Sequence, residues 1–201
     1  MIVSARTLLP LLAVLLSGPL AGCDLFGPRD PEPPIDEGSG FEVPTAPNIL
    51  LDNLRRSITE ANAIDYRRNF SDGTAGLPSF RFTPASDGAS IDPGLFANWT
   101  VAEEEEYIRD LFSELVEGGI ASLVLTPPDV SEAALGDSLL YAADYALNVP
   151  HTRSGVEREA FGRFVVTMKL SERNEWYITA WQDIALDDRS TWSVIKARFA
   201  R

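Results

Sequence analysis

The residue types that support metal and redox chemistry are scarce in this sequence. Among its 201 residues there is one cysteine, Cys23, and one histidine, His151. Structural zinc requires about four Cys or His ligands, and calcium requires about six oxygens supplied by a compact loop. The sequence offers neither set, so we expect no metal site and no cofactor. His151 follows Pro150 in an expected turn, where we predict a solvent-exposed residue with no catalytic role.

Polar residues within alternating apolar segments are the remaining candidates for catalysis. They are Asp144, Tyr145, Arg163 and Asp183, whose side chains could face an enclosed cavity. A buried carboxylate with a raised pKa can act as a general base. Polar residues are equally common on the exposed face of a half-buried sheet. We therefore assign no catalytic residue and keep Asp144 and Asp183 as the first two to test.

The segments that would carry these residues show the period of β-strands. Five segments are predicted strands: 80–83, 122–126, 139–149, 163–170 and 176–184. Turn-forming residues fill 150–155 and 171–174, so we expect the last three strands to form antiparallel hairpins.

Helices are expected before the long strands. Asn48 can cap a first helix, and a short helical turn is expected around residues 65–70. Thr100 and Glu103 have the spacing of a capping box and open another helix, which we expect to end at residues 118–119. Acidic residues at 103–106 favour the positive end of the helix dipole, so we predict a solvated face there rather than a cation site.

The N-terminal segment carries a targeting signal. Residues 7–22 contain no charged side chain, but Pro10 and Pro19 interrupt an apolar run that is too short to span a membrane. Residues 1–22 are therefore a predicted secretory signal peptide. The sequence Leu20-Ala21-Gly22-Cys23 resembles the lipobox of bacterial lipoproteins. That resemblance implies cleavage before Cys23, lipidation of Cys23, and anchoring to a membrane at the periplasmic face or the cell surface.

The rest of the chain divides into a linker and one domain. Residues 23–47 comprise Cys23 and a proline-rich, acidic segment without helical or strand period, which predicts a disordered tether. Residues 48–201 are long enough for a single folded domain. The net charge of −13 excludes a typical nucleic-acid binder, because neutralising phosphates requires a basic surface. The sequence predicts no oligomeric state.

The order of these elements resembles the nuclear-transport-factor-two-like superfamily, which includes ketosteroid isomerases and SnoaL-like cyclases. The segments that carry the resemblance are the first helix, 64–70 with 80–82, 99–115, the three long strands ending at 176–183, and 191–199. The resemblance implies an α+β cone in which N-terminal helices pack on a curved antiparallel sheet. No catalytic motif of the superfamily matches this sequence.

Three functions follow as alternatives. The favoured one is a noncatalytic envelope lipoprotein that binds a small apolar ligand or a partner protein. The second is an isomerase or hydratase that uses an acid inside the cone, and it predicts a cavity with several polar groups. The third is a structural or assembly lipoprotein, and it predicts a cone filled by its own aromatic residues. The tryptophans, at 99, 176, 181 and 192, are expected in the core rather than around a pocket.

Overall fold

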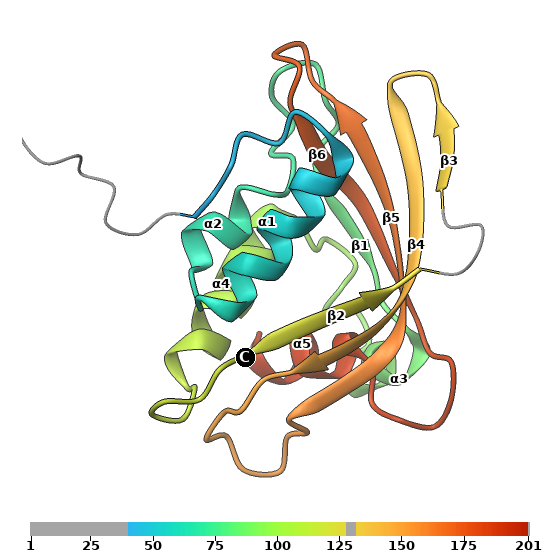
Figure 1. Cartoon of the computed structure of the whole chain (residues 1–201). Coiled ribbons are helices and arrows are strands. Elements are labelled where there is room, and N and C mark those ends of the chain that lie inside the picture. The colour runs from blue at the N-terminus through green and yellow to red at the C-terminus, as the bar shows by residue number, and fades with distance from the viewer. Residues whose placement is uncertain (1–39, 128–131, 201) are drawn as a thin grey trace, which may run out of the picture. The chain divides into compact units, whose positions relative to one another are not determined.

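The computed structural model describes residues 40–127 and 132–200 (Figure 1). The predicted signal peptide, Cys23 and the tether up to residue 39 lie outside the described residues. The helices are α1 (Pro47–Thr59), α2 (Ala63–Arg67), α3 (Ser86–Ile91), α4 (Val101–Ser113) and α5 (Trp192–Phe199). The strands are β1 (Arg81–Thr83), β2 (Ser122–Thr126), β3 (Glu132–Leu135), β4 (Ser138–Asn148), β5 (Glu159–Leu170) and β6 (Trp176–Ile184).

The strands form one strongly curved sheet in the order β1-β6-β5-β4-β2, with β3 also paired to β4. β4, β5 and β6 are joined as antiparallel hairpins, and β1 runs parallel to β6. Helices α1, α2 and α4 lie together on one side of the curved sheet (Figure 1). This architecture confirms the predicted fold class, an α+β cone with N-terminal helices packed on a curved antiparallel sheet.

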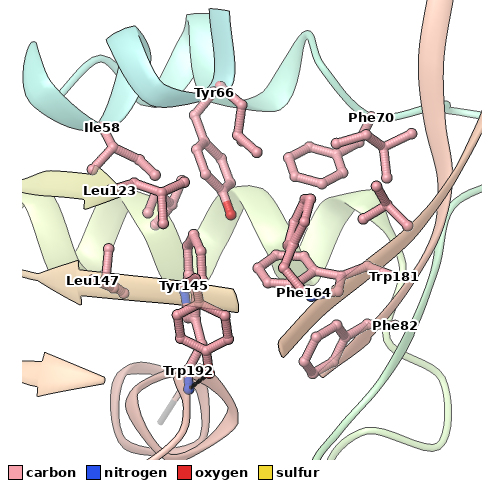
Figure 2. Packing of buried hydrophobic residues seen from close by; sticks show 14 of the residues in the cluster. Ile58, Tyr66, Phe70, Phe82, Leu123, Tyr145, Leu147, Phe164, Trp181 and Trp192 are labelled. Carbon is pink, nitrogen blue, oxygen red and sulfur yellow. Dashed lines mark hydrogen bonds between the residues drawn. The ribbon is translucent and has the colours of Figure 1, made fainter. Parts of the chain in front are cut away.

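The core lies between the helices and the inner face of the sheet. In Figure 2, Ile58 and Tyr66 come from the helices, with Ile58 beside Leu123, while Phe164 and Trp181 come from the strands and Trp192 from α5. Trp99, Trp181 and Trp192 are almost completely buried, as predicted, whereas Trp176 is partly buried. Aromatic rings therefore occupy much of the interior of the cone.

Helix α4 begins as predicted but ends early. Thr100 and Glu103 form the expected capping box, whereas the last helical residue is Ser113 rather than a residue near 118. The following segment leaves the helix because its backbone pairs with the turn after β4. The Val116 amide donates to the carbonyl of Pro150, and the Thr152 amide donates to the carbonyl of Glu114, each at 2.8 Å.

The folded body begins earlier than Asn48. Pro47 is the first residue of α1, a position where proline fits because the amide it lacks has no partner in the helix. Residues 42–44 also contact the body: the Trp176 amide donates to the carbonyl of Pro44 at 2.8 Å, and the Glu42 amide donates to Oδ1 of Asn53 at 3.0 Å. Residues 42–47, which the sequence places in the tether, therefore pack with the folded body.

Helix α3 was not predicted, and its contact with α5 depends on a glycine. A Cβ atom added to Gly88 would lie 2.3 Å from Cβ of Ser193, so only glycine permits the observed approach. Asp87 fixes the same contact, because its Oδ1 accepts a hydrogen bond from the Thr191 hydroxyl at 2.8 Å.

Candidate functional site

Asp144 lies on the outer face of the sheet. Its neighbours Ala143 and Tyr145 point into the core, so the alternation along β4 directs Asp144 outward. Asp144 stands directly opposite Arg163 on β5, and the Arg163 Nε atom donates to Oδ1 of Asp144 at 2.7 Å. The two side chains are 47% and 39% exposed. The expectation that Asp144 and Arg163 face the cone interior is therefore wrong.

Asp183 is buried and holds α5 against the sheet. Its Oδ1 accepts a hydrogen bond from the Tyr145 hydroxyl at 2.8 Å. Its Oδ2 accepts from the Ser193 amide at 2.8 Å and the Ser193 hydroxyl at 2.6 Å. Burial raises the pKa of Asp183, while the hydrogen bonds from Ser193 and Tyr145 act in the opposite direction. Since the Tyr145 hydroxyl also accepts from the Trp192 amide at 2.7 Å, this network fixes the first turn of α5.

A second buried carboxylate, Glu104, was not predicted. The acidic run at 103–106 was expected to face solvent, but Glu104 is 0% exposed. Its Oε1 accepts hydrogen bonds from the Tyr66 hydroxyl at 2.7 Å and from Nζ of Lys196. Its Oε2 accepts from Nε1 of Trp99 at 2.6 Å. Glu104 therefore joins α2, α4 and α5 at the centre of the core.

The pKa values of the ionisable groups around Glu104 are shifted from their usual values. Lys196 is also 0% exposed, and burial lowers its pKa to about 8, while the carboxylate of Glu104 acts in the opposite direction. Burial raises the pKa of Tyr66 and Tyr107 well above the usual value, and the negative charge of Glu104 adds to both shifts. Each buried charge of the pair is thus compensated by the other.

Sequence spacing contains a signal for this pair. Glu104, Ile108 and Leu111 lie at helical positions that share the buried face of α4. In the same way, Lys196 follows Trp192 by four residues and precedes Phe199 by three on the buried face of α5. Each of these two helices has one charged residue on its apolar face. This pattern indicates two buried side chains of opposite charge.

His151 is buried rather than exposed. Its ring is 0% exposed and packs edge-on against Phe199, with ring centroids 5.0 Å apart. The bridge between Leu115 and His151 draws this turn against the end of α4, which explains the burial. The Nε2 atom lies 3.1 Å from the carbonyl oxygen of Glu157. The prediction of a solvent-exposed His151 is therefore wrong, and its lack of a catalytic role stays a prediction.

The outer surface carries a groove of about 190 Å³. Its lining comes from the segment before α1, the end of α2, the loop after it, and the turn between β5 and β6. The lining residues are Phe41, Val43, Pro44, Arg67, Arg68, Phe70, Ser71, Asp72, Thr74, Ala75, Leu77, Arg173, Glu175 and Tyr177. We call these residues the surface groove. The sequence gives no local signal for it, because the stretches that line it, residues 41–44, 67–77 and 173–177, are far apart in the chain.

Arginine side chains and aromatic rings line the surface groove. Arg67 lies 3.6 Å from carboxylate oxygens of Asp72 and Glu105, longer than a hydrogen bond. Arg68 stacks on the ring of Phe41, with its central carbon 3.8 Å from the ring centroid. Partial burial and a 2.6 Å hydrogen bond donated to Glu175 raise the pKa of Tyr177 to about 12. Tyr177 therefore stays protonated at neutral pH.

Metal-binding geometry is not found in the parts of the chain that the structure describes. Within residues 40–127 and 132–200, no three His, Cys, Asp or Glu side chains gather closely enough to hold a metal ion.

Comparisons with known proteins identify the fold without identifying an activity. No protein-family model and no curated protein sequence matches the chain. A candidate aromatic ring hydroxylase from Novosphingobium aromaticivorans is 15% identical with a TM-score of 0.51, covering 74% of this chain and 92% of that one. A conserved protein from Planctomyces limnophilus is 11% identical with a TM-score of 0.52, covering 68% of this chain and 91% of that one.

A nuclear-transport-factor-two-like protein of unknown function from Pseudomonas putida is similar in structure as well. It is 11% identical, with a TM-score of 0.48, and the match covers 70% of this chain and 84% of that one. At such identities the similarity concerns the fold alone. The described part of the chain is thus an α+β fold in which helices pack on a curved sheet, and its function must be argued from its own residues.

Proposed function

We propose that this protein is a lipid-anchored, noncatalytic binding module of a bacterial envelope, and that its ligand binds in the surface groove. The observation that carries this proposal is the contrast between the groove and the cone interior. The interior carboxylates Glu104 and Asp183 accept hydrogen bonds from buried partners at both oxygens. The groove, in comparison, is open to solvent and lined by guanidinium and aromatic groups.

The chemistry of the surface groove favours a small monocarboxylate. Arginine presents paired N–H donors that match the geometry of a carboxylate, and Arg67 is 36% exposed toward solvent. Leu77 and Tyr177 offer apolar contact for the body of such a ligand. Asp72 and Glu175 also line the groove and would repel a second negative charge. A volume of about 190 Å³ is below that of sites for drug-sized ligands, which favours a single-ring molecule.

Attachment to a membrane rests on the lipobox at residues 20–23. The lipid on Cys23 would hold the protein to the membrane, with the acidic tether as spacer. Phe41, Val43 and Pro44, near the first of the described residues, line the surface groove. Among the described residues, the helices are too short or too polar for any to traverse a bilayer.

Benzoate is a suitable probe of the surface groove. Titration of the purified protein, followed by NMR chemical shifts, is expected to perturb Arg67, Tyr177 and their neighbours in a saturable way. Arg67→Gln should weaken binding by about tenfold, because it removes a charge-assisted hydrogen bond. Arg189→Gln is the matched control, since Arg189, like Arg67, lies beside an aspartate, but outside the groove.

Benzyl alcohol tests the need for charge, and it should bind more weakly than benzoate. Equal binding of benzoate to the Arg67→Gln variant, or shifts spread away from the groove, would contradict the assignment of the site.

A structural or assembly lipoprotein is the second candidate. The observation that favours it is the filling of the cone by its own aromatic residues, among them Phe164, Trp181 and Trp192. A protein that binds no small carboxylate, but is recovered with a stable envelope partner after cross-linking in cells, would favour this function over the first.

A further inference from the structure

Lys196 is surrounded by aromatic rings inside the cone. Its Nζ atom lies within 6 Å of five ring centroids. The distances are 4.1 Å to Trp181, 4.5 Å to Phe82, 4.6 Å to Tyr107, 5.7 Å to Trp99 and 5.8 Å to Trp192. We call these five rings the aromatic cage. Three of them, Phe82, Trp181 and Trp192, are visible at the lower part of Figure 2.

The carboxylate that faces the ammonium group is positioned independently of Lys196. Glu104 is held by the Tyr66 hydroxyl at 2.7 Å and by Nε1 of Trp99 at 2.6 Å. Neither partner belongs to α5. Glu104 is therefore expected to keep its place when the Lys196 side chain is removed.

Most of the aromatic cage comes from elements other than α5. Phe82 belongs to β1, Trp99 precedes α4, Tyr107 belongs to α4 and Trp181 to β6. Only Trp192 shares a helix with Lys196. The rings pack against one another: Phe82 and Trp181 have centroids 5.1 Å apart, and Trp99 and Tyr107 have centroids 6.3 Å apart.

Ring faces attract an ammonium group through cation-π interactions, and a carboxylate adds a charge-assisted hydrogen bond from its N–H groups. A buried ion pair would require only Glu104 opposite the lysine. We propose that the interior of the cone is a binding site for a primary alkylammonium group, which the chain occupies with its own Lys196. The site is closed to external amines in the native protein because the Lys196 side chain fills it. This inference is independent of the ligand proposed for the surface groove.

Chemical rescue tests the proposal. Lys196→Ala removes three carbons and the ammonium nitrogen, which together have the size and charge of propylammonium. The full variant protein is expected to have a lower Tm at pH 7 than the wild type, because Glu104 loses its counter-charge. Propylammonium chloride should raise the Tm of this variant in a saturable way, on the order of 5 °C.

The controls separate the ammonium site from simple filling of a cavity. Sodium chloride at equal ionic strength and 1-propanol should leave the Tm of Lys196→Ala unchanged. The wild type and Lys196→Met should not respond to propylammonium, because a side chain already fills their cage. An equal rise with 1-propanol, an equal rise in Lys196→Met, or no rise with propylammonium would overturn the proposal.

A second measurement applies if Lys196→Ala does not fold in buffer. The variant is then refolded with propylammonium or with 1-propanol, and the near-ultraviolet circular dichroism of the buried tryptophans is recorded. Recovery of the native signal with propylammonium alone supports the site. Failure to recover it with propylammonium overturns the proposal.

Discussion

Asp144 and Asp183 carry the same chemical group in opposite surroundings. Asp144 forms one exposed ion pair with Arg163, and such pairs contribute about 0–1 kcal/mol. Asp183 is buried and accepts hydrogen bonds from Tyr145 and Ser193. The same substitution at the two positions should therefore have very different effects on the free energy of unfolding.

We predict that Asp183→Ala lowers the free energy of unfolding by about 2–4 kcal/mol, because it leaves buried donors of Tyr145 and Ser193 without an acceptor. Asp144→Ala should change it by less than about 1 kcal/mol. Urea denaturation followed by tryptophan fluorescence measures both values. Similar losses for the two variants would show that the network around Asp183 does not hold α5 in place.

At the scale of elements, the segment before α1 behaves as part of the folded body. Pro44 is buried, and its carbonyl accepts from the amide of Trp176 at 2.8 Å. The Asn53 side chain is buried and exchanges hydrogen bonds with the backbone of Glu42 in both directions. Removing this segment leaves the Trp176 amide of β6 and the Asn53 side chain of α1 without their described hydrogen-bond partners.

A chain that begins at residue 48 is therefore expected to be less stable than one that begins at residue 40, by about 2–4 kcal/mol. A disordered tether over residues 23–47, as the sequence predicts, would instead leave stability nearly unchanged on trimming to Asn48. Thermal and urea denaturation of the two truncated proteins provide the comparison. Equal stability of both would show that residues 40–47 contribute only contacts that water replaces.

At the scale of the whole molecule, Cys23 is the proposed link between the folded body and a membrane. We predict that Cys23→Ser abolishes lipidation and leaves an unprocessed or soluble product, because the hydroxyl does not replace the thiol in the lipid thioether. Membrane fractionation with labelling by a fatty-acid analogue measures the outcome. A Cys23→Ser protein that is still acylated and still found with membranes would contradict the prediction.

Local pattern was enough to predict much of the fold. The third long strand spans 176–184 as expected, and the capping box at Thr100 and Glu103 forms as its spacing predicts. Such elements depend on neighbours a few residues away, so their signals survive in the sequence. The lipobox at Cys23 is also a local signal, and lipidation stays a prediction.

The remaining features depend on contacts between residues that are far apart in the sequence. Glu104 and Lys196 are separated by 92 positions. The spacing within each helix indicates burial of the residue, but it does not show that the two side chains meet. The surface groove likewise joins segments as distant as Phe41 and Tyr177. Which charged groups become buried together depends on how α4 and α5 pack on the curved sheet. The sequence by itself therefore determined most of the long helices and strands and a predicted lipoprotein signal. Only the tertiary structure decided which side chains meet, because burial and pairing are properties of packed surfaces rather than of adjacent residues.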